Sequence, residues 1–292
     1  VRTATQWGVY DLEIEDDKIV AVHGIDADPN PAQIKQVLLD SVQHSSRIKR
    51  PSIRRGWLHG ESRARHLRGA DEFVEVPWDE ALELAASELQ RVRTEYGNRA
   101  IFAGSYGWAS AGRFHHAQSQ LHRFINLMGG CTRAMNSYST AAAQVILPHV
   151  VAPWPQMELH QTTWQDIVEQ SDFVVAFGGL PLRNAQVAYG GITEHNTQNE
   201  LHRAQQRGVK FCNISPLQQD MPDWLQAYIV MPRPGTDVAL MLGLAYVLET
   251  ENLLDRQFLR THCTGYEAFK KYLLGIPDGV PKTPAWAAKV AD

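Results

Sequence analysis

Cysteines are few in this sequence, and the three present lie far apart. Cys131, Cys212 and Cys263 do not form the local set of four thiolates that holds an iron–sulfur cluster. Their spacing gives no disulfide framework either. The sequence therefore predicts neither an iron–sulfur cluster nor a fold stapled by disulfides.

Long apolar runs and a net positive charge are also missing. No stretch of eighteen apolar residues, signal-peptide core or twin arginine at the start occurs, which favours a cytoplasmic protein without a membrane partner. A leader lost from the start would place it in the periplasm instead. The net charge of −4 argues against nucleic acid as a partner. With 292 residues, 44% hydrophobic and 21% charged, the chain has room for about two globular domains.

Two common catalytic motifs are absent as well. A nicotinamide dehydrogenase needs G-x-G-x-x-G directly after a strand, but the turn at Gly104 has another spacing and Gly178-Gly179 lacks a third glycine in register. A hydrolase of the G-x-S-x-G type is disfavoured because Gly104-Ser105-Tyr106-Gly107 does not supply that motif.

The most informative stretch runs from Ile101 to Gln144. Residues 100–103 form a short apolar run that predicts a buried parallel strand, followed by a glycine-rich turn. A helical pattern opens at Arg113 and stops at Gly129-Gly130. Its apolar face consists of Phe114, Ala117, Leu121, Phe124 and Met128. This is half of an α/β unit, in which ligands bind at the carboxyl ends of strands.

Two loops in this stretch have both a structural and a functional interpretation. Tyr106 and Trp108 are aromatics that either pack in a core or offer hydrogen-bond donors to a ligand among the glycines. In the second loop, Ser139 or Thr140 is a candidate N-cap for a helix over 141–147. A cap accounts for one hydroxyl, but it does not explain why this loop should face the aromatic turn.

The first part of the chain predicts a small β-rich domain over residues 1–72. Residues 7–24 alternate around Asp16-Asp17 as a hairpin does, and residues 32–42 have a helical pattern. The basic cluster at 47–55 is either a solvated surface or a seat for phosphates. Residues 56–72 are polar and predict a loop. An α/β domain then covers 73–152 and begins with a helix from Asp79 that ends at Gly97 and packs on the strand at 100–103.

The last part, residues 153–292, predicts a doubly wound parallel sheet. Apolar strands are expected at 172–177, 209–214 and 227–231, and helices at 197–207 and 236–248. Polar or glycine-rich segments follow the strands, namely 178–184, 213–216 and 235–237. Each alone is a turn or a helix cap, but together they predict a nucleotide-binding crevice.

Several ordered motifs together resemble the dimethyl sulfoxide reductase family of molybdenum enzymes. They are G-S-Y-G-W-x-S at 104–110, G-R-x-H at 112–115, Y-S-T-x-A-A-Q at 138–144, P-H-V-V at 148–151 and G-T-D-V-A-L-M-L-G at 235–243. Within the family, W-G-V-Y at 7–10 and V-H-G-I-D-A-D-P at 22–29 are most similar to biotin sulfoxide reductases, followed by trimethylamine N-oxide reductases. The resemblance covers nearly the whole chain and identifies it with the N-terminal part of such an enzyme.

The resemblance implies a molybdenum-dependent oxidoreductase that takes oxygen from S-oxides of the biotin, methionine or dimethyl sulfoxide type, or alternatively from trimethylamine N-oxide. Ser139 is then the metal ligand, and Tyr106 and Trp108 donate hydrogen bonds to the oxygen being transferred. The cofactor is bis(molybdopterin guanine dinucleotide), and the electron donor is not identified. Its binding residues are expected at Gly107, Gly178, Gly179, Pro181, Asn184, Asn213, Ser215, Pro216, Gly235 and Asp237.

Some features leave other interpretations open. Many members of the family have glycine where Ala141 stands, and a glycine of positive φ there would make alanine shift the Ser139 loop. His115 and His122 lie seven residues apart on a helix, but no carboxylate or thiol partner stands nearby for a metal site. A third possibility is a non-catalytic fragment or scaffold, because the family's closing C-terminal domain is not recognisable here.

Overall fold

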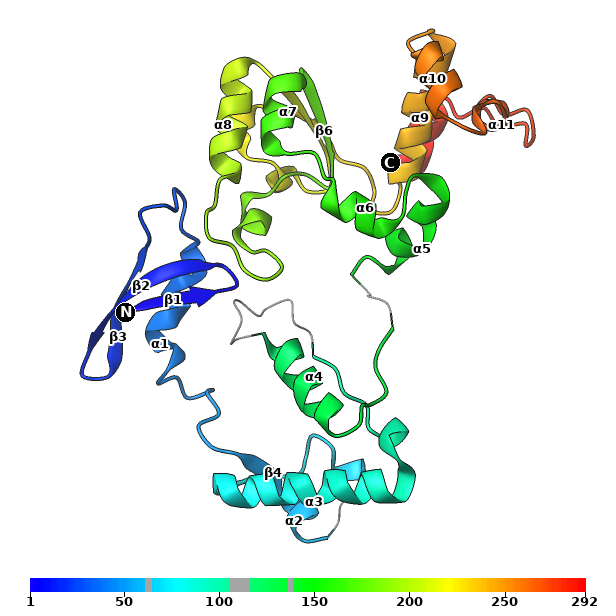
Figure 1. Cartoon of the computed structure of the whole chain (residues 1–292). Helices are drawn as coiled ribbons and strands as arrows, with labels where there is room; N and C mark the ends of the chain where they lie inside the picture. The colour runs from blue at the N-terminus through cyan, green and yellow to red at the C-terminus, as the bar shows by residue number, and fades with distance from the viewer. Residues whose placement is uncertain (61–64, 106–115, 136–138) are drawn as a thin grey trace. The chain divides into compact units, whose positions relative to one another are not determined.

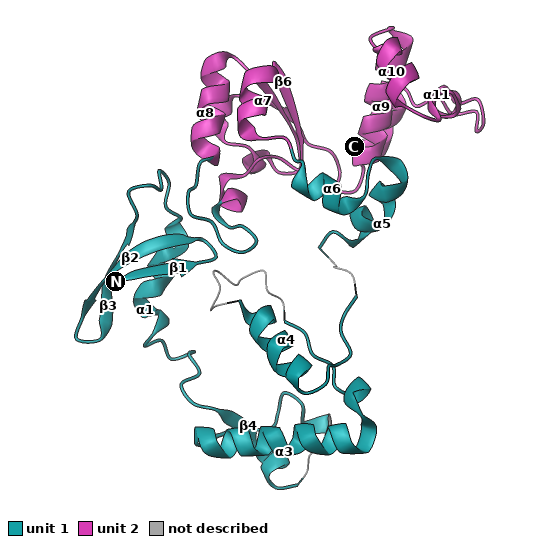
Figure 2. Ribbon diagram, viewed as in Figure 1, with its two compact units in different colours: residues 1–161, 186–196 teal, residues 162–185, 197–292 magenta. Residues whose placement is uncertain are grey.

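The computed structural model describes residues 1–60, 65–105, 116–135 and 139–292. These divide into two compact units (Figure 2). The first unit comprises Val1–Gln161 and Gln186–Asn196, and the second comprises Thr162–Ala185 and Thr197–Asp292. The chain therefore leaves the second unit after Ala185 and returns to it at Thr197. The division into three domains expected from the sequence stays a prediction.

The chain begins with a three-stranded antiparallel sheet (Figure 1). Its strands are β1 (Arg2–Thr5), β2 (Gly8–Glu15) and β3 (Lys18–Gly24), in the order β1-β2-β3. The predicted hairpin is confirmed, and Asp16 and Asp17 form its turn with φ of 47° and 59°. A turn with two positive φ values matches the twist of the flanking strands, and aspartate tolerates that conformation.

Short elements and three longer helices make up the rest of the first unit. They are η1 (Gln33–Val37), α1 (Leu38–Ser41), β4 (Ser52–Arg54), α2 (Arg55–Leu58), η2 (Arg65–Leu67), β5 (Phe73–Glu75), α3 (Trp78–Tyr96), η3 (Asn98–Ala100), α4 (Ala117–Leu127), α5 (Ala141–Val150) and α6 (Trp154–Leu159). Strands β4 and β5 pair antiparallel. The helical pattern predicted at 32–42 is a 3₁₀ segment followed by one α-helical turn.

Helix α3 ends where predicted, at Gly97 with φ of 74°. Leu89 and Val92 of this helix pack against a small core formed by Ile101, Ala103 and Ile125. The strand expected at 100–103 is shorter than predicted. Ala100 closes η3, and among the described residues the β-pairing of this stretch is a single parallel bridge between Phe102 and Thr132. Two glycines of positive φ, at 129 and 130, turn the chain just before Thr132 and so limit the pairing on that side.

The second unit is built on a parallel sheet in the order β6-β7-β8. Its elements are α7 (Trp164–Gln170), β6 (Phe173–Phe177), α8 (Thr197–Arg207), β7 (Lys210–Ile214), η6 (Gln218–Asp220), η7 (Asp223–Leu225), β8 (Tyr228–Val230), α9 (Asp237–Thr250), α10 (Arg256–His262), α11 (Tyr266–Leu273) and α12 (Pro284–Ala291). The 3₁₀ turn η5 (Leu182–Gln186) lies at the point where the chain passes to the first unit. The three strands and two helices predicted for this part are confirmed, whereas α7 was not predicted.

One face of this sheet carries the main core of the second unit. Ala176 of β6 and Phe211 of β7 are buried there against Val168 of α7 and Leu201 of α8. The core follows from the alternation of side chains along strands, which sends every second residue to the same face. No helix among the described residues is long and apolar enough to cross a membrane.

A buried carboxylate ties three helices of the second unit together. The side chain of Glu249 in α9 is 6% exposed and accepts from Arg256 Nη1 at 2.7 Å, Lys270 Nζ at 2.6 Å and the Tyr266 hydroxyl at 2.5 Å. The Arg256 guanidinium, followed by Lys270 and Tyr266, lowers the pKa of Glu249 to about 2. Because these partners come from α10 and α11, the carboxylate fixes both helices against α9.

Glu249→Gln is expected to lower the free energy of unfolding by about 2 kcal/mol at neutral pH, because it removes the buried charge with which the half-buried Arg256 and Lys270 pair. The folded-state pKa of Glu249 is depressed, so its contribution is complete above the ordinary value of 4.5 and is lost as pH falls toward about 2. Urea unfolding across this range should show a flatter pH dependence in the variant. Glu88→Gln, which breaks an exposed pair with Arg91, is the control and should change little. If both substitutions lowered the free energy of unfolding equally, Glu249 would not be the carboxylate that fixes α10 and α11 against α9.

Candidate functional site

Three loops of the second unit begin next to one another at the carboxyl edge of the parallel sheet. Phe177 pairs with Ile214, and Ile214 pairs with Val230. The ladder continues one step past the strands, since Gly178 N donates to Ile214 O at 2.9 Å and Ser215 N donates to Val230 O at 3.0 Å. The loops that follow the three strands therefore start side by side, as the sequence predicted.

The loop after β6 depends on two consecutive glycines. Gly178 and Gly179 have φ of 88° and 77°, a conformation that other residues rarely adopt. A Cβ atom at Gly179 would lie 2.2 Å from the backbone oxygen of Asp220, whereas one at Gly178 would meet nothing within 4 Å. Gly179 is thus required for a close approach of two loops, and Gly178 exposes its backbone to open space.

Asp220 links the loops that follow β6 and β7. Its backbone oxygen accepts from Leu180 N at 2.7 Å, and its carboxylate accepts from the Ser215 hydroxyl and from Arg183 Nη2, both at 2.6 Å. The Ser215 hydroxyl, and after it the Arg183 guanidinium, hold the pKa of the Asp220 carboxyl below its usual range. The carboxylate is therefore ionised and holds both loops in one arrangement.

The predicted cofactor-binding residues at this edge differ in their exposure. Gly178, Asn184, Pro216 and Gly235 are exposed, while Gly179, Pro181 and Asp237 are half-buried. Asn213 and Ser215 are 0% and 1% exposed. Asn213 Nδ2 donates to Leu217 O at 3.4 Å, and Asn213 Oδ1 has no hydrogen-bond partner among the described residues. Ser215 shapes the loop through Asp220, and the side-chain oxygen of Asn213 remains an acceptor for a donor that reaches it.

The start of α9 forms the third part of this edge. Gly235 has φ of 83°, Thr236 is the N-cap and Asp237 is the first residue of the helix. The Thr236 hydroxyl donates to Arg233 O at 2.6 Å and so does not cap the helix. Arg233 anchors the preceding loop to the end of α12, donating from N to Ala291 O and from Nη2 to Val290 O, each at 2.7 Å. The amide groups at the start of α9 are thereby held in place.

The predicted metal-ligand loop belongs to the first unit. Ser139 is exposed and stands two residues before α5. The N-cap of α5 is Thr140, not Ser139, and the Thr140 hydroxyl accepts from Gln144 Nε2 at 2.8 Å. Ala141 is the first residue of α5 and has no positive φ, so alanine fits this position without backbone strain. Ser139 is therefore not needed as the cap.

The remaining sequence-derived candidates lie elsewhere in the chain. Tyr106, Gly107, Trp108 and His115 lie outside the described residues. His122 lies on α4, and within the described ranges no group of three or more histidine, cysteine, aspartate or glutamate side chains is placed to hold a metal ion. The basic cluster at 47–55 is partly occupied by local contacts, such as the ion pair of Arg55 with Glu72 at 2.7 Å. Its role as a phosphate seat stays a prediction.

Sequence reasoning missed Asp220 and Arg183 as partners at the sheet edge. The two are 37 residues apart, and no local pattern connects them. Arg183 belonged to the predicted loop 178–184, but the acid that holds it lies after the next strand. Only the pairing of the two loops in space makes the connection visible.

Comparisons with known proteins show the family of this chain. The sequence model of the molybdopterin oxidoreductase family matches residues 47–276, and that of the molybdopterin oxidoreductase N-terminal domain matches residues 3–42. The dimethyl sulfoxide/trimethylamine N-oxide reductase of Cereibacter sphaeroides is 40% identical over 99% of this chain. The biotin sulfoxide reductase of the same organism is 41% identical over 90% of it.

The chain spans only 35% and 36% of the length of these two relatives. Among solved structures, acetylene hydratase from Pelobacter acetylenicus is similar with a TM-score of 0.58 and 22% identity, covering 99% of this chain and 37% of that one. At that identity the likeness concerns the fold alone. The mixed α/β fold with a small N-terminal β-sheet that the sequence predicted is thus confirmed.

Proposed function

Because this chain belongs to the molybdopterin oxidoreductase family, we propose that it serves the reduction of S-oxides at a molybdenum–pterin centre. The reaction is R₂S=O + 2e⁻ + 2H⁺ → R₂S + H₂O. The observation that carries this proposal is the identity of 40% and 41% to two relatives whose names specify sulfoxide substrates. Trimethylamine N-oxide is the second candidate substrate, since the name of the first relative includes it.

We further propose that the second unit is part of a doubly wound domain whose sheet edge binds the guanine dinucleotide portion of the cofactor. The residues present fit such a ligand. Gly178 leaves its backbone open to an approaching group, and the start of α9 offers amide donors of the kind that bind phosphates. Asp237 is a carboxylate acceptor suited to the amino groups of guanine, and the unpartnered Asn213 Oδ1 is a second acceptor.

The catalytic residues are proposed from the motif positions. When bound, molybdenum supplies the two-electron chemistry. Ser139 would supply an oxygen ligand, which suits a high-valent metal better than a soft thiolate does. The indole N–H of Trp108 and the phenol of Tyr106 would donate hydrogen bonds to the oxygen that leaves the substrate, where each donor can contribute about 3 kcal/mol. Support for Ser139 is its exposed position beside, and not within, the cap of α5.

Tyr106→Phe is expected to lower kcat/KM for S-oxides more than for N-oxides, by roughly 10- to 100-fold, because the phenol donates to the substrate oxygen. The resemblance supports this asymmetry, since some trimethylamine N-oxide reductases lack this tyrosine. The measurement is kcat/KM for dimethyl sulfoxide and for trimethylamine N-oxide in both proteins. Equal losses on the two substrates would remove Tyr106 from substrate choice.

The proposed function is tested first by the cofactor content of the protein purified without oxygen. Elemental analysis and pterin fluorescence should give about one molybdenum and two pterins per chain. Absence of both would favour a non-catalytic fragment or scaffold. Turnover of an S-oxide with a reduced dye as electron donor then separates a catalytic protein from one that only stores the cofactor.

A further inference from the structure

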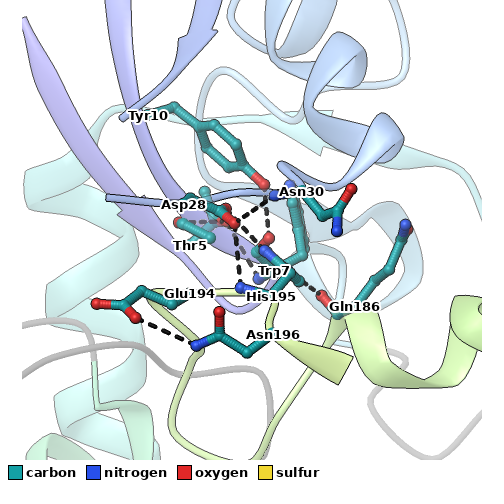
Figure 3. Close-up of polar contacts among 10 residues, drawn as sticks. Thr5, Trp7, Tyr10, Asp28, Asn30, Gln186, Glu194, His195 and Asn196 are labelled. Atoms are coloured by element: carbon teal, nitrogen blue, oxygen red, sulfur yellow. Dashed lines mark hydrogen bonds and ion pairs between the residues drawn. The ribbon is translucent and has the colours of Figure 1, made fainter. Parts of the chain in front are cut away.

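A buried histidine–carboxylate pair lies outside the sheet edge and the catalytic loops described above (Figure 3). Asp28, in the loop after β3, and His195, in the segment Gln186–Asn196, are each 5% exposed. Nδ1 of His195 lies 2.7 Å from Oδ2 of Asp28, although the two residues are 167 positions apart. A buried carboxylate is costly unless its oxygens have partners, and both oxygens of Asp28 have them here.

Asp28 holds both the ring and the backbone of His195. Its Oδ1 accepts from His195 N at 3.0 Å and from Asn30 N at 3.1 Å, while Oδ2 faces the ring. Two contacts to one residue fix its main chain and its side-chain direction together. The position of the segment at His195 is therefore determined by a loop of the N-terminal sheet.

The other ring nitrogen of His195 contacts Gln186, at the start of the same segment Gln186–Asn196. Nε2 lies 3.2 Å from the backbone oxygen of Gln186, which can only accept. Nδ1 also faces an acceptor. The ring of His195 therefore lies between two oxygen acceptors, one on each of its nitrogens.

Two neighbouring side chains, Tyr10 and Glu194, make their hydrogen bonds with other residues. The phenol of Tyr10 donates to Trp7 O at 2.5 Å, and burial, followed by the charge of Asp28, raises the pKa of Tyr10 to about 12. Tyr10 is thus neutral. The carboxylate of Glu194 is exposed and accepts from Asn196 Nδ2 at 3.2 Å.

Gln186 is the last residue of η5, two positions after Asn184. At the other end of η5, Arg183 is held by Asp220 of the sheet edge. We propose that Asp28 and His195 are positioning residues, whose buried contact holds Gln186 and thereby orders the end of the η5 turn, two residues after Asn184. This inference rests on the proposed function for its ligand, but the pair and its hold on η5 are testable without it.

The first test is the contact itself in the wild-type chain. In nitrogen NMR of the ¹⁵N-histidine-labelled protein, Asp28→Asn should shift the ring signals of His195, whereas Glu13→Gln should leave them in place. His195→Gln identifies the signals. Ring signals that Asp28→Asn leaves unchanged would overturn the contact.

The second test is hydrogen exchange of the peptides that cover residues 182–196, in the full chain. Asp28→Asn keeps the shape and removes the charge, and His195→Gln removes the ring. Each should raise exchange there by about tenfold or more, and the double variant should exchange no faster than either single one, because the residues act as a unit. Glu13→Gln is the matched control, since Glu13 makes an exposed contact of 2.8 Å with His23 in the same sheet. Unchanged exchange in both single variants would overturn the proposal.

The third test separates a positioning role from general stabilisation. Guanine nucleotide per chain is measured over time after dilution of the purified holoprotein, together with the melting temperature. Asp28→Asn should release the nucleotide about tenfold faster even where the protein remains fully folded, and Glu13→Gln should match the wild type. Equal release rates would overturn the link to the cofactor. If the wild type contains no guanine nucleotide, the proposed function fails, and the exchange result alone decides whether the pair holds η5.

Discussion

Ser139→Ala should lower S-oxide turnover by at least about a hundred-fold and leave the fold unchanged. Replacing even the outer partners of a metal ligand costs 10- to 100-fold in activity or affinity, so removing the ligand itself costs no less. The fold is expected to persist because the side chain of Ser139 is exposed, and exposed substitutions usually stay within about 0.5 kcal/mol. The measurements are kcat with a sulfoxide substrate, molybdenum per chain and the melting temperature.

Thr140→Ala is the matched control for this substitution. Thr140 is the neighbouring hydroxyl and the N-cap of α5, and it accepts from Gln144. Its loss should cost a fraction of a kcal/mol in stability and little in turnover, because its contacts are local to the helix. If the control lost activity and the Ser139 variant kept it, the ligand assignment would move by one residue.

Gly179→Ala is expected to destabilise the second unit by about 3 kcal/mol, whereas Gly178→Ala should cost only about 1 kcal/mol. Both alanines are strained by the positive φ of the backbone. Only the Cβ at Gly179 also meets a backbone atom, the Asp220 oxygen at 2.2 Å. A backbone neighbour cannot rotate away as a side chain can. The loops that follow β6 and β7 must therefore separate in the Gly179 variant.

The free energies of unfolding of the Gly179→Ala and Gly178→Ala variants are measured with urea. Their difference separates the cost of the steric contact from the cost of the backbone strain. Equal losses of stability would mean that the Gly179–Asp220 approach is not tight in solution. We also expect the Gly179 variant to retain less guanine nucleotide than the Gly178 variant, because it alone displaces Asp220 and the Ser215 and Arg183 contacts that depend on it.

Much of the second unit could be predicted because its elements have local signals. Strands β6 and β7 are short apolar runs ended by glycine or by Asn-Ile-Ser-Pro, and α8 and α9 have clear boundaries. Helix α7 was missed although its start carries a signal, the capping box of Thr163 and Asp166. The strand at 100–103 was overestimated, because an apolar run does not reveal how long its partner stays extended.

The residues of the candidate sites also differ in how far the sequence could predict them. Loops that follow strands could be predicted as one edge, because parallel strands end on the same side of a sheet. Contacts that depend on two distant segments could not. Asp220 with Arg183, and Asp28 with His195, join residues whose neighbours in the sequence say nothing of their partners. The motif residues Tyr106 and Trp108 rest on the family resemblance and stay predictions.

The contact between Asp28 and His195 also has a consequence for biosynthesis. A ribosome adding about 10 residues per second takes roughly 17 s to synthesise the 167 positions that separate them. The three strands of the N-terminal sheet are complete at the start of that interval, so they leave the ribosome before the ring of His195, which faces the Asp28 carboxylate, has been synthesised. A chain arrested anywhere before His195 would present this loop unfinished, with an acidic side chain still in need of water or a chaperone.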